Sequence, residues 1–152
     1  MTSRFATLAL AAALALPTIA SAQDMDPNVH ARQSLMDLYA YNLGVLGAMA
    51  QARMPYDADA ASSAATSLYH LARSGSARMW PAGTDSMSIE GTRALPAIWD
   101  DMAGFGSRFM ALQTATETMM NAAGTDLASL QGAMGALGSA CGGCHQSFRQ
   151  PE

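Results

Sequence analysis

Two cysteines and a histidine stand together near the end of the chain, in the sequence Cys141-Gly142-Gly143-Cys144-His145. On a helix, two thiols three residues apart lie on one side of a turn, where they can add to the two vinyl groups of a haem edge. The adjacent imidazole then reaches the iron as its proximal ligand. The motif C-x-x-C-H therefore predicts one haem c, attached covalently through two thioethers, and we expect Gly142 and Gly143 to lie where the ring comes closest.

Other uses of a cysteine pair fit this sequence less well. A dithiol of the thioredoxin kind follows a strand, and no strand pattern precedes Cys141. A structural zinc site needs four ligands, and His30 and His70 are far from the motif in the sequence. A disulfide is compatible with an oxidising compartment, but the histidine directly after Cys144 favours haem attachment.

The first 22 residues have the pattern of a secretory signal. A short start containing Arg4 precedes an apolar run over residues 5–16, and Ala20-Ser21-Ala22 fits the small-x-small rule for cleavage. The run is too short to remain as a membrane-spanning helix, and no later segment is apolar enough to span a membrane. We expect cleavage after Ala22, which leaves residues 23–152 as one periplasmic domain that is not inserted in the membrane.

The rest of the chain shows helical spacing of its apolar residues and no alternating strand pattern. A first helix should open at Asp26-Pro27 and end near Arg53, and a second should start near Asp57 or Asp59. Residues 74–92 are expected to form a long connection between the second and third helices. A third helix should begin near Leu95-Pro96 and reach the break at residues 121–124, and a fourth should run from Thr125 or Asp126 almost to Pro151.

This order predicts an all-α, up-down-up-down antiparallel four-helix bundle with the haem near the C-terminus of the last helix. Most methionines should fill the core, as methionine at helical spacing usually does. The methionines expected there are Met49, Met102, Met110, Met119, Met120 and Met134.

The chain resembles the class II c-type cytochromes, which comprise cytochrome c' and its low-spin, methionine-ligated relatives. The resemblance covers essentially all of the expected mature chain. It rests on Arg32-Gln33 with Met36, on Trp80-Pro81-Ala82-Gly83-Thr84, on Ala97-Ile98-Trp99 and on the segment from Cys141 to Arg149. It implies the same bundle and the same cofactor.

Arg32 lies in the apolar seam of the first helix, the row of residues that recurs at steps of three and four. A charged side chain at such a position needs a partner. A haem propionate would supply one, and the resemblance implies that role for Arg32, with Gln33 nearby. It also implies that Arg149, four residues after His145, lies beside the proximal imidazole. The alternatives are an Arg32 side chain that reaches solvent and an Arg149 that only balances the charge of a helix C-terminus.

Met36 decides between two functions. It lies one turn after Arg32, and an antiparallel arrangement offsets it from His145 by roughly 7.5 Å along the bundle, a gap that a haem can bridge. The resemblance implies that this position faces the sixth coordination site. A bound thioether gives a low-spin haem suited to electron transfer, whereas an uncoordinated methionine leaves the iron open to NO or CO. The stretch from Leu38 to Gly44 resembles the low-spin members and favours ligation.

We therefore expect a one-electron carrier with redox proteins as its partners, and no enzyme, because a haem peroxidase would need acid–base groups beside the iron. The alternative is a five-coordinate protein that binds NO or CO. A net charge of −4 without any lysine argues against nucleic acid as a partner. The wide apolar face of the first helix allows a homodimer.

Overall fold

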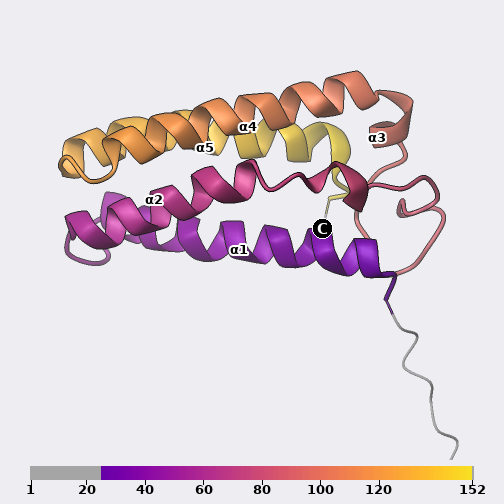
Figure 1. The fold of residues 1–152 in the computed structure, drawn as a ribbon, viewed down its shortest axis with the longest axis horizontal. Helices are drawn as coiled ribbons and strands as arrows, with labels where there is room; N and C mark the ends of the chain where they lie inside the picture. Colours follow the sequence, from indigo (N-terminus) through magenta and orange to yellow (C-terminus); the bar gives the residue numbers. More distant parts are fainter. Residues whose placement is uncertain (1–24, 152) are drawn as a thin grey trace, which may run out of the picture.

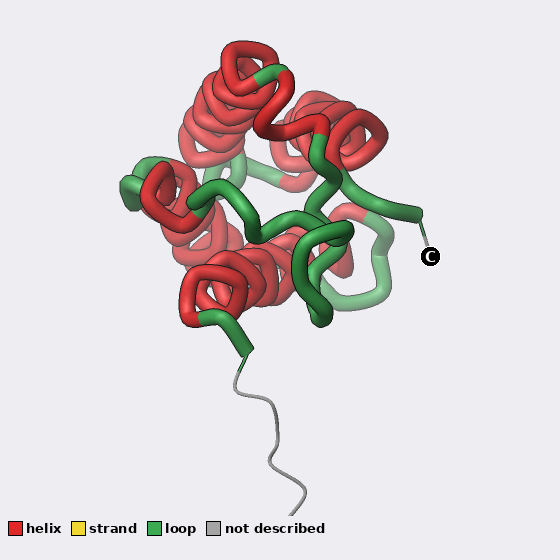
Figure 2. Tube along the Cα trace, turned by 90° about the vertical axis from the view of Figure 1, so that its right-hand side faces the viewer, coloured by secondary structure: helices red, strands yellow, loops and turns green. Residues whose placement is uncertain are grey.

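The computed structural model describes residues 25–151, which form four long helices (Figure 1). The predicted signal at residues 1–22 lies outside the described residues. The helices run up-down-up-down, and a view along the bundle shows them around a common centre (Figure 2). No helix in the described part of the chain is long and apolar enough to cross a membrane. The long helices are α1 (Pro27–Ala50), α2 (Ala58–Ala72), α4 (Met102–Ala122) and α5 (Leu127–Phe148).

Aspartates begin each of the long helices. The carboxylates of Asp26, Asp57 and Asp126 accept hydrogen bonds from backbone N–H groups of the first turns of α1, α2 and α5. Each carboxylate satisfies donors that the helix itself leaves unpaired. The three starting points expected from the sequence are therefore confirmed. At the other end, α1 stops at Ala50, a few residues before the expected end.

The prediction of one continuous third helix is wrong, because this part of the chain is divided into α3 (Ala97–Asp100) and α4. Asp101 leaves the helical conformation, with φ −132° and ψ 65°, and its carboxylate accepts a hydrogen bond from Gly104 N over 2.8 Å. The expectation that Met102 and Met110 are core residues is also wrong, since they are 47% and 63% exposed. Met102 directly follows the break at Asp101, and Met110 lies outside the buried face of α4.

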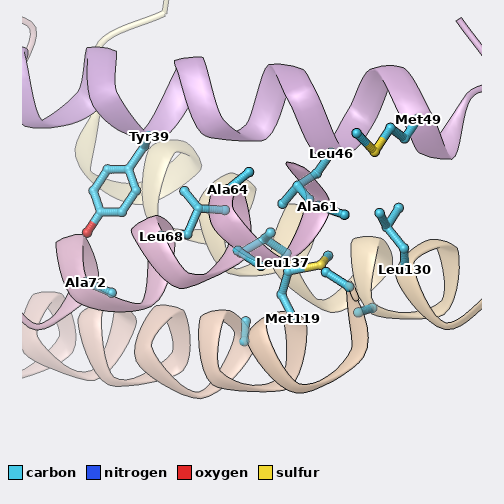
Figure 3. Packing of buried hydrophobic residues seen from close by; sticks show 14 of the residues in the cluster. Tyr39, Leu46, Met49, Ala61, Ala64, Leu68, Ala72, Met119, Leu130 and Leu137 are labelled. Carbon is cyan, nitrogen blue, oxygen red and sulfur yellow. The ribbon is translucent and has the colours of Figure 1, made fainter. Parts of the chain in front are cut away.

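Apolar side chains from all four long helices form the main core. Leu46, Leu68, Met119 and Leu137 come from α1, α2, α4 and α5 and converge between the helices (Figure 3). All are almost completely buried, and burying a side chain of this size contributes about 1.5–3 kcal/mol. This core fixes the positions of α1 and α5 at one end of the bundle.

A second, smaller apolar cluster lies at the other end, where the long connection and the end of α5 meet. It is built on Ile98, Phe105 and Phe148, and Cys144 packs against it. The connection contains a short helix, η1 (Ser76–Met79). Two backbone hydrogen bonds, Leu95 N to Phe148 O and Gln150 N to Arg93 O, hold the segment before α3 against the end of α5.

Candidate functional site

Cys141, Cys144 and His145 lie on the last two turns of α5, on the face of the helix that lines a cavity. The two sulfurs are not bonded to each other, and both side chains are partly buried. Burial raises the pKa of both thiols, so both are held in the neutral form. The helix thus presents two thiols and an imidazole together, as the spacing of the motif predicts.

Gly142 and Gly143 do not lie where the sequence predicted. Neither lines the cavity, and a Cβ on Gly143 would stand 3.1 Å from Arg108 Nη1. The reason is the helical repeat, because the two positions between the cysteines point away from the side on which the cysteines lie. The expectation that the glycines make room for the ring is wrong.

The cavity lies between α1 and α5 and has a volume of about 580 Å³. This is the size range of cofactor sites, which are mostly apolar with a few polar groups. Aromatic and aliphatic side chains from α1, α4, α5 and the long connection form much of its wall. All seven site residues expected from the sequence line it: Arg32, Gln33, Met36, Cys141, Cys144, His145 and Arg149.

Arg32 is only 4% exposed, so its side chain does not reach solvent. Its Nη1 donates to Thr84 Oγ1 over 2.9 Å, and its Nη2 donates to Thr92 Oγ1 over 2.7 Å and to the carbonyl oxygen of Thr84. The guanidinium lies 4.7 Å from the centre of the Trp80 ring. Burial lowers the pKa of Arg32, although the charges of nearby aspartates oppose this shift. These partners are neutral, and no carboxylate in the described part of the chain is bonded directly to the guanidinium.

Gln33 also binds the long connection. Its Nε2 donates to the carbonyl oxygen of Gly91 over 2.6 Å. Gly91 has a φ of +79°, in the left-handed region that favours glycine. Arg32 and Gln33 together therefore fix the connection across one end of the cavity.

Positive charge is concentrated around the cavity, although the chain as a whole is acidic. Arg32, Arg93, Arg108 and Arg149 all line it, and Asp37 is the only carboxylate among the described lining residues. Burial lowers the pKa of His145, and the charges of Arg149 and Arg93 lower it further. The site therefore favours a neutral imidazole, the form that binds a metal, and it favours ligands that carry negative groups.

Two lining residues were missed when the site was deduced from the sequence. The hydroxyl of Tyr39 and the indole Nε1 of Trp80 are buried, and neither has a hydrogen-bond partner within the described residues. Both side chains line the cavity. The sequence contained a signal for each, since Tyr39 follows Met36 by three residues in the same seam and Trp80 belongs to the loop motif.

The other histidines take no part in the site. His30 and His70 are exposed on the first turn of α1 and near the end of α2. Within residues 25–151, no group of three or more His, Cys, Asp or Glu side chains is placed to hold a metal ion.

The chain is similar to known proteins over nearly all of the described residues. The family model of cytochrome c' matches residues 27–149. A cytochrome c-554 from Cereibacter sphaeroides is 44% identical over 140 residues, covering 91% of this chain and 92% of that protein. A cytochrome c' from the same organism is 38% identical over 135 residues, covering 89% and 91%. The structure of a cytochrome c' from Rhodobacter sphaeroides matches with a TM-score of 0.80 at 37% identity, covering 82% of this chain and 96% of its own.

Proposed function

The chain belongs to the cytochrome c' family, and from this premise we propose that it is an exported periplasmic carrier of single electrons whose haem iron is bound by His145 and Met36. Proteins of this family carry a covalently attached haem c, and the chain has the two cysteines that this cofactor needs. The observation that carries the proposal is that Met36 and His145 line the same cavity from two different helices, α1 and α5.

The residues of the cavity fit a haem. Cys141 and Cys144 lie on one face of α5, where both thiols can form thioethers to one edge of the ring. The buried donors of Tyr39 and Trp80 have no partner among residues 25–151, which is expected of groups that face a polar part of a cofactor. The aromatic side chains around Phe105 supply an apolar wall for the faces of the ring.

The arginines of the cavity would hold the two propionates. Arg32 is buried and its hydrogen-bond partners among the described residues are neutral, so a carboxylate beside it would balance its charge directly. Gln33 is the next residue along α1, and Arg149, whose charge acts on His145, also lines the cavity. This placement would point the propionates away from the main core and toward the long connection.

The iron of the bound haem supplies a reversible one-electron change. His145 would donate its neutral imidazole from α5, and Met36 would donate its thioether sulfur from α1. A thioether ligand stabilises ferrous iron and raises the reduction potential. A filled sixth position also excludes exogenous ligands, which suits an electron carrier.

An optical spectrum of the purified haem protein tests this proposal, recorded oxidised and reduced, with and without CO. We expect a low-spin spectrum with a methionine-to-iron charge-transfer band that CO does not change. Met36→Leu should abolish the band, give a high-spin spectrum, lower the reduction potential and permit CO binding. Met134→Leu serves as the matched control, because Met134 is a partly buried core methionine of α5 that does not line the cavity.

A high-spin wild-type spectrum that shifts on addition of CO would contradict ligation by Met36. It would assign the chain to the alternative function, the binding of NO or CO at an open sixth position. Cell fractionation tests the periplasmic location, and sedimentation tests for a homodimer through α1, whose outer face carries the exposed Leu38 and Tyr41.

A further inference from the structure

Tyr39 carries a polar group that the fold leaves without a partner. Its side chain is 6% exposed, and its hydroxyl is buried without a hydrogen bond to any described residue. Buried hydroxyls almost always have a partner, because burial removes the hydrogen bonds that water would provide. The hydroxyl belongs to a cavity-lining residue, so the missing acceptor is expected inside the cavity.

Tyr39 lies beside Met36 on α1. The two residues are three positions apart, so their side chains are neighbours on one face of the helix, and both line the cavity. Side chains on a helix lean toward its N-terminus, and Figure 3 shows the hydroxyl of Tyr39 displaced from its backbone in the direction away from Leu46 and Met49. The turn that carries Met36 lies on that side of Tyr39, and the same view shows the hydroxyl also extending away from α1.

The hydroxyl is available as a donor at any working pH. Burial raises the pKa of Tyr39 to about 12, and the nearby Cys141 is a second cause of the shift. The phenol therefore keeps its proton. Among the described residues that line the cavity, Met36, Cys141 and Cys144 carry sulfur, and only Met36 belongs to α1.

We propose that the Tyr39 hydroxyl donates a hydrogen bond to the thioether sulfur of Met36 when that sulfur is bound to the haem iron, and that it thereby adjusts the reduction potential. This inference rests on the proposed ligation by Met36. The hydrogen bond withdraws electron density from the sulfur, which weakens its donation to ferric iron more than to ferrous iron. Tyr39 is thus a positioning residue, because it acts on the iron through Met36.

Removal of the hydroxyl tests the proposal in the haem-loaded protein. Tyr39→Phe should keep the methionine-to-iron charge-transfer band, shift its position and lower the reduction potential. The stronger ferric iron–sulfur bond should make imidazole bind to ferric iron about three- to tenfold more weakly, the range expected for one neutral hydrogen bond. Tyr41→Phe is the matched control, because Tyr41 lies on the same helix and is 72% exposed. It should change none of these measurements.

A double-mutant cycle identifies the acceptor. If the hydroxyl acts through Met36, Tyr39→Phe should leave the reduction potential unchanged in the Met36→Ala background. An equal shift in both backgrounds would overturn the proposal and indicate Cys141 or the ring as the acceptor. An unchanged band and potential in Tyr39→Phe with intact Met36 would also overturn it. A wild-type spectrum without the charge-transfer band would instead show that the ligation by Met36 fails, and the Tyr39 interaction with it.

Discussion

Nη1 of Arg32 donates to Oγ1 of Thr84 over 2.9 Å, and this bond joins α1 to a loop 52 residues further along the chain. The same guanidinium binds Thr92. The haem end of the bundle therefore depends on one buried side chain that holds the long connection in place.

We expect Arg32→Met to lower the free energy of unfolding of the haem-loaded protein by about 2–4 kcal/mol, because it leaves buried oxygens without donors. Arg32→Lys should show an intermediate loss, since lysine keeps the charge but lacks the planar fork. Guanidinium denaturation followed by circular dichroism measures both. A methionine variant as stable as the wild type would mean that these hydrogen bonds make no net contribution.

The two thiols should contribute separately to haem attachment. Cys141→Ser or Cys144→Ser should leave one thioether, so haem stays with the chain on a denaturing gel while its absorption moves to longer wavelength, because one vinyl group remains conjugated. The double variant should lose haem on the gel. Haem staining and a pyridine haemochrome spectrum measure this, and haem that persists in the double variant would show attachment elsewhere.

Asp85 should make the loop sensitive to acid. The hydroxyl of Ser88 and the backbone N–H groups of Met87 and Ser88 donate to its carboxylate, and these bonds lower its pKa below the usual value of 3.8. A carboxylate with a lowered pKa in the folded state stabilises the protein above the unfolded pKa, and this contribution is lost as the pH falls through the folded value.

Asp85→Asn should therefore be less stable than the wild type at pH 7, and the difference should shrink below about pH 4. Unfolding curves at several pH values measure it. Glu90→Gln is the control, because Glu90 is an exposed residue of the same connection. A difference that stays constant with pH would rule out the carboxylate as its cause.

Glycines on the outer side of α5 should limit the stability of that helix. Gly138 is exposed, and a Cβ there would meet no atom within 4 Å. Gly138→Ala should raise the free energy of unfolding by about 0.5–1 kcal/mol, since alanine restricts the unfolded chain and favours the helix. Gly143→Ala should gain less, because the Arg108 side chain must move. Thermal unfolding measures both, and a destabilised Gly138→Ala would contradict the open space.

Local signals in the sequence were enough to predict most of the fold. Asp26-Pro27 predicted the start of α1, and apolar residues that recur at steps of three and four predicted four helices. The break at Asp101 was not predicted, because Ile98 and Phe105 keep helical spacing on both sides of it. Whether a helix continues through such a point depends on the aspartate cap and on tertiary packing, which no local pattern reports.

The sequence predicted which residues form the candidate site, but it predicted the contacts of these residues less well. The motif C-x-x-C-H identified Cys141, Cys144 and His145 directly, and all seven predicted residues line one cavity. The partners of Arg32 in the long connection were not predicted, because they are 47 to 60 residues away and the loop has no periodic pattern. The unpartnered hydroxyl of Tyr39 could only be found once burial was known.

The helix α5 packs unevenly against its two neighbours, α4 and α1. α5 contacts α4 extensively, whereas it meets α1 through far fewer contacts, with the cavity between them. The interface between α1 and α5 is therefore less tightly packed than the interface between α4 and α5. A bond from Met36 to an iron carried on α5 would join the two helices across this interface, so its length would respond to the spacing between them.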